Sequence, residues 1–151
     1  MDIQKIRPDK EQARSILRIA ALIEDRIALE NKPGMESLVV ADYYEIIKEL
    51  VTAIMLSEGY KTLSHKELIE YLKEMKEFKE HEIRIADDLR ILRNKISYQG
   101  FLIDPDYLKR NADNFKLIKE KLKNILTKKL GLNPRQMSNN EVKHNEKTNL
   151  Q

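Results

Sequence analysis

The sequence predicts an all-α protein: an antiparallel bundle of about five helices over residues 1–132, followed by a disordered polar tail over residues 133–151. Three observations carry this prediction. The chain has only four glycines and four prolines and is rich in Ile, Leu, Lys and Glu, a composition that favours helices over strands. Apolar residues recur at helical spacing in five separate segments. Short connections join these segments, which favours antiparallel packing.

The first two helices are bounded by sequence signals. Asp9, with Gln12 three residues later, is a candidate capping box, and helical spacing continues from there to the Asn-Lys-Pro-Gly turn at residues 31–34. The residues that carry this spacing are Ile16, Ile19, Ala20, Ile23 and Ile27. A second helix is predicted over about residues 37–57, ending at Gly59. It is apolar on most of its circumference, so we expect it at the centre of the bundle.

A short third helix and a long fourth helix follow. Ser64 and Glu67 form a second candidate capping box, which opens the short helix. The long helix is predicted over about residues 78–98, with Gly100 closing it. We find no internal repeat and no convincing strand in the sequence.

The last helix has the clearest start signal of the five. Asp104 stands directly before Pro105, a residue that is favoured in the first turn of a helix. The helical spacing that follows ends near residues 130–131. Beyond it the sequence is strongly polar, and we expect residues 133–151 to form a tail that cannot pack.

Composition and charge exclude several classes of protein. The chain contains no cysteine, which excludes disulfides, thiolate metal sites and cysteine nucleophiles, and which favours a cytoplasmic location. The most apolar run is interrupted by charged residues, so no membrane span is expected. Zinc spacing and an EF-hand loop are missing from the sequence, and we expect neither a metal nor a cofactor. A net charge of +3 does not by itself indicate a nucleic-acid partner.

The helix predicted over residues 78–98 has two distinct faces. One narrow stripe is apolar and should face the core; it consists of Ile85, Leu89, Leu92 and Ile96. A second stripe on nearly the opposite side mixes apolar and polar side chains; it consists of Ile83, Asp87, Ile91, Asn94 and Tyr98. Such a mixed stripe is typical of a contact surface, and homodimerisation is the simplest explanation. The alternative is that this stripe only touches the last helix or the loop over residues 99–103.

Two stretches of the chain resemble the HEPN family, whose name refers to nucleotide binding in higher eukaryotes and prokaryotes. They are DYYEIIKELVTAIMLSEGYKTLSHKELIEYL at residues 42–72 and LRNKISYQGFLID at residues 92–104. The resemblance implies an antiparallel helical bundle that dimerises through the face carrying the family motif. It also implies a metal-independent ribonuclease, or a toxin paired with a nucleotidyltransferase-type antitoxin.

The family motif is an arginine, four to six residues, and then a histidine, often with asparagine after the arginine. Arg93 and Asn94 match the first two positions, but Tyr98 stands where the family has histidine, and Gly100 where some members have a further tyrosine. A tyrosine hydroxyl, with an ordinary pKa of about 10, is a poor general base at neutral pH. The resemblance therefore implies a catalytic role for Arg93 and for Tyr98, which takes the place of the histidine.

Other residues could complete a ligand site around the motif. Arg90 and Arg93 present planar guanidinium groups suited to phosphate, and a symmetric dimer would bring two copies of each together. The residues that we expect to bind a ligand are Arg90, Arg93, Asn94, Glu45, Glu49 and His65. The structural alternative for Arg93 is an ion pair with Asp87, Glu45 or Glu49, and for His65 it is a capping or packing role.

These observations lead to three functional hypotheses. The first is a homodimeric HEPN-like protein, catalytically degenerate, that binds a nucleotide, RNA or a nucleotidyltransferase-type partner. The second is an active metal-independent endoribonuclease that uses Arg93 with Tyr98 or His65. The third is a structural dimerisation module.

Overall fold

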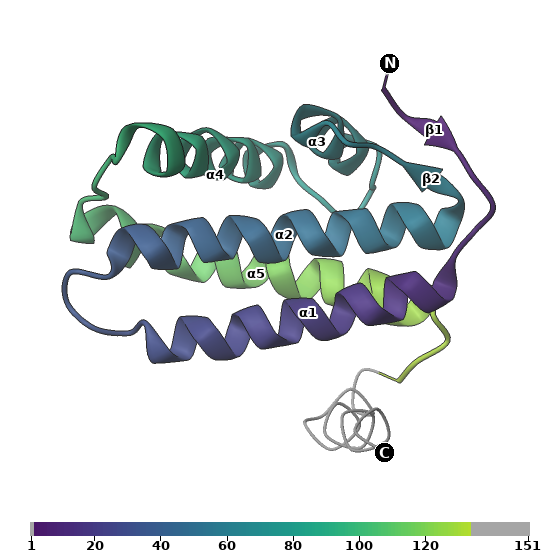
Figure 1. Ribbon diagram of the computed structural model, residues 1–151, viewed down its shortest axis with the longest axis horizontal. Coiled ribbons are helices and arrows are strands. Elements are labelled where there is room, and N and C mark those ends of the chain that lie inside the picture. The colour runs from purple at the N-terminus through teal and green to yellow at the C-terminus, as the bar shows by residue number, and fades with distance from the viewer. Residues whose placement is uncertain (1, 134–151) are drawn as a thin grey trace.

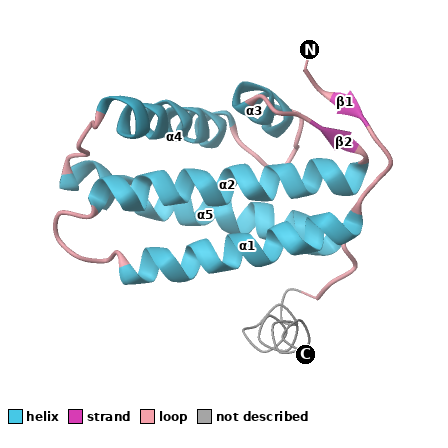
Figure 2. Ribbon diagram, in the orientation of Figure 1, coloured by secondary structure: helices cyan, strands magenta, loops and turns pink. Residues whose placement is uncertain are grey.

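The computed structural model describes residues 2–133, which form five α-helices and a two-stranded sheet (Figure 1). The helices are α1 (Lys10–Leu29), α2 (Glu36–Glu58), α3 (His65–Lys73), α4 (Glu80–Gln99) and α5 (Pro105–Lys129). Helices α1, α2, α4 and α5 run side by side, and the short α3 is inclined to them (Figures 1 and 2). The predicted all-α antiparallel bundle is confirmed. The predicted tail, apart from Asn133, lies outside the described residues.

Helix α1 begins where its capping signal predicts. The Asp9 carboxylate accepts a hydrogen bond from the Gln12 backbone N–H at 2.9 Å, which satisfies one of the free donors of the first turn. The buried positions of α1 are Ala13, Leu17, Ala20 and Ile23. Ile19, which also carries the helical spacing, is 48% exposed, because it lies about 100° around the helix from the buried Ala20.

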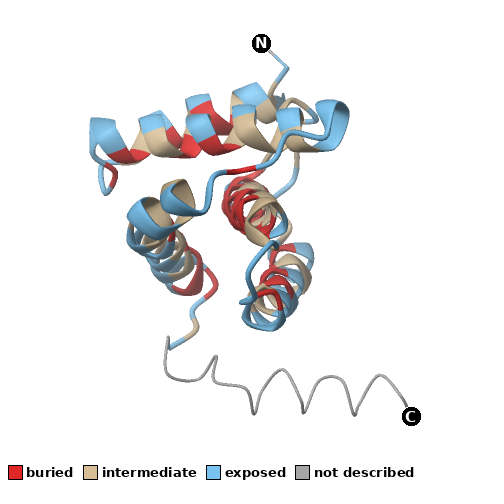
Figure 3. Ribbon diagram, turned by 90° about the vertical axis from the view of Figure 1, so that its left-hand side faces the viewer, coloured by how far each residue is buried: buried red, intermediate tan, exposed pale blue. Residues whose placement is uncertain are grey.

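Helix α2 is the central helix, as predicted, and packs against α1, α3, α4 and α5. Figure 3 shows that buried residues lie where the helices face one another and that exposed residues cover the outer faces. The fully buried side chains of α2 include Tyr44, Ile46, Ile47, Leu50, Ile54 and Met55. Because α2 is buried on most sides, its few polar side chains are directed at specific neighbours rather than at bulk water.

Gly59 ends α2 and is required there for two reasons. Its φ of +92° is a left-handed conformation, which residues with a Cβ adopt at a cost. A Cβ at this position would also lie 2.9 Å from the Ile6 carbonyl oxygen. The close approach exists because the Ile6 N–H donates to the Gly59 carbonyl oxygen at 2.9 Å, which holds the N-terminal segment against the end of α2.

A small sheet lies next to this turn. Strand β1 (Gln4–Lys5) pairs in antiparallel register with β2 (Tyr60–Lys61), with Gln4 opposite Lys61 (Figure 2). The expectation of no strand is wrong for these residues. Two residues per strand are too few to produce the alternating pattern by which strands are recognised in a sequence.

The connection between α4 and α5 is fixed to the start of α2. Gly100 closes α4 in a left-handed conformation with φ +63°, as predicted. Ser37 then donates its hydroxyl proton to the Phe101 carbonyl oxygen at 3.5 Å and accepts from the Ile103 N–H at 2.8 Å. The last turn of α4 is therefore held in place relative to α2.

No helix in residues 2–133 is both long enough and apolar enough to span a membrane.

Candidate functional site

The two stripes predicted on α4 have different environments. On the core stripe Leu89 is fully buried, and Ile85, Leu92 and Ile96 pack against the core. On the second stripe Ile83 also packs partly against the core, whereas Asp87 and Asn94 are of intermediate exposure. Ile91 and Tyr98 are exposed, Tyr98 to 79%. Only the C-terminal half of the second stripe therefore presents apolar surface to solvent.

Arg93 connects α4 to α2 through an ion pair. Its Nε donates to the Glu45 carboxylate at 3.2 Å, and both side chains are about three-quarters buried. One turn earlier on α4, the Nε of Arg90 donates to the Asp87 carboxylate at 2.8 Å. The Arg93–Glu45 pair is one of the three ion pairs named as the structural alternative for Arg93. Neither arginine makes a further hydrogen bond within residues 2–133 through its terminal Nη nitrogens, so each guanidinium group keeps donors for a ligand.

Lys48 extends the charged network along α2. Its ammonium group lies 2.7 Å from the Glu45 carboxylate and 3.4 Å from that of Glu49. Glu45 is thus shared between Lys48 and Arg93, whereas Glu49 contacts Lys48 and no arginine in the described part of the chain. We did not single out Lys48 from the sequence. Lys48 lies within one helical turn of both Glu45 and Glu49, and this spacing would have predicted ion pairs with them.

His65 lies at the same site, although it comes from the first turn of α3. Its ring packs against the Tyr44 ring at a centroid distance of 5.8 Å. Burial lowers the pKa of His65, and the positive charges of Lys48 and Arg93 lower it further. The imidazole is therefore neutral at pH 7 and has one nitrogen that can accept a proton.

Tyr44 is a second residue of this site that we did not select from the sequence. It is fully buried, and its hydroxyl oxygen has no hydrogen-bond partner among residues 2–133. Burial raises the pKa of Tyr44, and the adjacent Glu45 carboxylate adds to that effect, so the hydroxyl remains a neutral donor. A buried donor without a partner is costly, so the Tyr44 hydroxyl is an energetic cost to the fold at this site.

Tyr98 does not take part in this arrangement. It follows Arg93 by five residues on α4, or about 7 Å along the helix axis, and its side chain extends into solvent. Gly100 is the left-handed cap of α4, where a residue with a Cβ is strained. Arg93 therefore acts electrostatically on His65 of α3, and Tyr98 of its own helix supplies no base to this site.

Four large apolar side chains are exposed on the C-terminal half of α4 and in the loop that follows it. We use the name α4 patch for these four residues, Ile91, Tyr98, Phe101 and Leu102. Leu102 is 82% exposed, and its loop is fixed by the hydrogen bonds to Ser37. A rigid loop that displays large apolar side chains is typical of a protein–protein contact surface.

The carboxylates of α2 do not act together as one group. Asp42 accepts hydrogen bonds from Arg26 of α1 at 2.8 Å and 2.6 Å, whereas Glu45 is bonded by Arg93 of α4. Within residues 2–133, no group of three or more His, Asp or Glu side chains is arranged to hold a metal ion.

Comparisons of the chain with protein-family models, with curated proteins and with solved structures found no match.

Proposed function

We propose that this chain is a homodimeric HEPN-like protein that binds the phosphate groups of RNA or of a nucleotide at Arg93 and Arg90, without efficient catalysis. The observation that carries the proposal is the state of the two guanidinium groups. Each is oriented by a carboxylate through its Nε, while its Nη donors make no hydrogen bond within residues 2–133. An arginine held in this way can bind phosphate with little further loss of side-chain freedom.

The charge balance of one subunit supports binding of moderate strength. Arg90, Arg93 and Lys48 face the carboxylates of Asp87, Glu45 and Glu49, so the cluster is close to neutral as a whole. A phosphate would have to compete with these carboxylates for the arginines. A twofold dimer would place two such clusters in one cleft and double the number of available guanidinium donors.

The α4 patch supports dimerisation beside the arginines. Tyr98 and Leu102 are the large apolar side chains most exposed on this part of the surface. A self-complementary contact through them would bury both residues and would bring the Arg93 sites of two subunits close together. The same patch would suit a nucleotidyltransferase-type partner if the chain belongs to a toxin and antitoxin pair.

An active ribonuclease is the second candidate, and the neutral His65 near Arg93 favours it. His65 would accept the proton of a ribose 2′-hydroxyl while the 2′-oxygen forms a bond to phosphorus and the bond to the 5′-oxygen breaks. Arg93 would stabilise the added negative charge on the phosphate oxygens. The protonated His65 would then return its proton to the departing 5′-oxygen. This route uses no proton transfer by Tyr98.

A nuclease assay in EDTA separates these hypotheses. Labelled RNA is incubated with the purified protein, with Arg93→Ala and with His65→Asn, and binding is measured on the same samples. RNA binding that is lost in Arg93→Ala, without cleavage, supports the degenerate binding protein. Cleavage in EDTA that disappears in both variants would establish the ribonuclease instead. A protein that binds no RNA and no nucleotide, and in which Arg93→Ala changes only stability, would leave the structural dimerisation module.

A further inference from the structure

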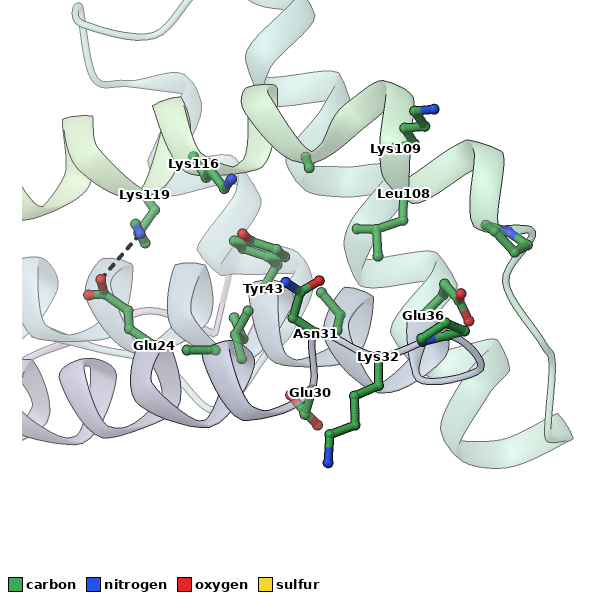
Figure 4. Close-up of a pocket in the computed structure, with 16 residues that line it drawn as sticks. Glu24, Glu30, Asn31, Lys32, Glu36, Tyr43, Leu108, Lys109, Lys116 and Lys119 are labelled. Carbon is green, nitrogen blue, oxygen red and sulfur yellow. Dashed lines mark hydrogen bonds and ion pairs between the residues drawn. The ribbon is translucent and has the colours of Figure 1, made fainter.

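A cavity that is separate from the arginine cluster lies between α1 and α5. Both helices pack on α2, but they approach each other little directly, so a cleft of about 710 Å³ remains between them. This volume is in the range of small-molecule sites. Its floor comes from Val39 and Tyr43 of α2, and the connection between α1 and α2 closes one end (Figure 4).

The walls of this α1–α5 cleft combine apolar surface with cationic groups. Apolar contacts are provided by Ile27 of α1 and Leu108 of α5. Lys119 lies 3.2 Å from Glu24 and is therefore neutralised (Figure 4). Lys116, one turn earlier on α5, also lines the cleft and makes no ion pair within residues 2–133. The cationic side of the cleft thus keeps the uncompensated ammonium group of Lys116 over an apolar floor.

Tyr43 adds a buried hydrogen-bond donor to the same cleft. Its side chain is 5% exposed, and its ring packs against Phe115 at a centroid distance of 5.4 Å. Its hydroxyl makes no hydrogen bond to any other described residue, although it lines the cavity (Figure 4). Burial raises the pKa of Tyr43, and the carboxylates of Glu24 and Asp113 add to the effect, so the hydroxyl stays protonated.

The remaining carboxylates leave the cleft suited to an anion. Glu36 accepts a hydrogen bond from the Gly34 N–H at 3.2 Å, next to the loop at the mouth. Glu30 is buried, and burial together with the nearby Asp42 raises its pKa to about 7, so it carries only part of a negative charge at neutral pH. Lys109 and Lys32 also line the cleft, and neither has an ion-pair partner within residues 2–133.

We propose that the α1–α5 cleft binds a small amphipathic anion, with its carboxylate or phosphate head at Lys116 and Tyr43 and its apolar body against Ile27, Val39 and Leu108. Both kinds of head accept hydrogen bonds from an ammonium group and a phenol. The apolar floor supplies the affinity for the body, and the two donors fix its orientation. This site is independent of the arginine cluster and of the function proposed for it.

The test titrates the full-length protein with octanoate, octyl phosphate, octan-1-ol and acetate, followed by the backbone amide signals in NMR. We expect octanoate, octyl phosphate or both to shift the signals of residues 27–43 and 105–119. Octan-1-ol should bind roughly tenfold more weakly, because it lacks the charge, and acetate should not bind. Binding of only one of the two charged octyl compounds would support the proposal and identify the head group.

Three variants locate the contact. Lys116→Gln should weaken the binding of the charged octyl compound roughly tenfold and leave octan-1-ol unchanged. Tyr43→Phe should weaken it several-fold. Lys128→Gln, which removes the same charge from α5 outside the cleft, is the control and should have no effect. The proposal is overturned if neither charged compound shifts these signals, if octan-1-ol binds as tightly as they do, or if Lys116→Gln and Lys128→Gln behave alike.

Discussion

Arg93 of α4 donates a hydrogen bond from its Nε to the Glu45 carboxylate of α2 at 3.2 Å, across 48 residues of sequence. This pair joins α4 to the central helix of the bundle. It gives Arg93 a structural contact and leaves its Nη donors available for a ligand. The structural and ligand-binding roles of Arg93 are therefore compatible.

Removing the charge of Glu45 should strengthen phosphate binding. In Glu45→Gln the carboxylate no longer competes for Arg93, so we expect the affinity for single-stranded RNA to rise several-fold in fluorescence anisotropy. The free energy of unfolding should fall by only about 0–1 kcal/mol, since the pair is partly exposed and Lys48 keeps Glu49. Weaker RNA binding in this variant would indicate that Glu45 contacts the ligand or is needed to orient Arg93.

The pKa of His65 should depend on the positive charges around it. Its pKa is expected below the ordinary value near 6.5, and Lys48→Gln and Arg93→Gln should each raise it, because each removes a neighbouring positive charge. The ring signals of His65 in an NMR pH titration report this directly. Arg18→Gln on α1 is the matched control. Equal pKa values in all four proteins would show that His65 lies outside the electrostatic reach of the site.

Glu30 should make stability decrease as pH rises. Its pKa is raised to about 7 by burial and by Asp42, so the folded state binds more protons than the unfolded state between about pH 4.5 and pH 7. The free energy of unfolding therefore falls through this window. Glu30→Gln remains neutral and can donate its amide to Asp42, so at pH 8 it should exceed the wild type by roughly 1–3 kcal/mol.

The measurement for Glu30 is urea denaturation at pH 5 and pH 8. The difference between wild type and Glu30→Gln should be small at pH 5 and large at pH 8. Glu11→Gln, which alters an exposed carboxylate of α1, serves as the control for a general charge effect. A difference that is equal at both pH values would contradict the assignment of the raised pKa to Glu30.

Gly59 should tolerate a side chain less well than Gly34. Both have φ near +90°, but only at Gly59 would a Cβ meet another atom, the Ile6 carbonyl oxygen at 2.9 Å. Gly34→Ala should cost about 1 kcal/mol for the backbone conformation alone, and Gly59→Ala roughly 1–3 kcal/mol more. Urea denaturation of the two variants measures this difference. Equal losses would show that the N-terminal segment does not pack against the end of α2.

The α4 patch should control self-association. We expect a dimer by light scattering at micromolar concentration, and Leu102→Asp should shift it to a monomer because a charge would be buried in the contact. Leu29→Asp on α1 alters a similarly exposed leucine, 76% exposed, and should leave the dimer intact. A wild-type protein that is strictly monomeric would exclude dimerisation through this surface.

The sequence contained enough information for the helices but not for the contacts between them. Asp9, Gly59 and Gly100 are local signals, and their caps were predicted correctly because capping depends on neighbouring residues only. The choice of Glu45 as partner for Arg93 depends on how α2 and α4 cross. A single sequence does not encode that crossing in any local pattern.

The same reason explains which site residues were missed. Tyr44 resembles an ordinary core aromatic in the sequence, and only the position of α3 brings His65 against it. The α1–α5 cleft exists because both helices pack on α2 without closing over Tyr43. Such spacing is decided by tertiary packing and leaves no motif.

The most direct test of the central claim is the affinity of labelled single-stranded RNA for three proteins, measured by anisotropy at two salt concentrations. Arg93→Ala removes the proposed phosphate ligand, and Arg18→Ala removes the same charge from α1. We predict that Arg93→Ala weakens binding roughly tenfold or more and reduces its salt dependence, while Arg18→Ala changes it less than about twofold. Equal effects of the two substitutions, or no binding by the wild type, would contradict a phosphate site at Arg93.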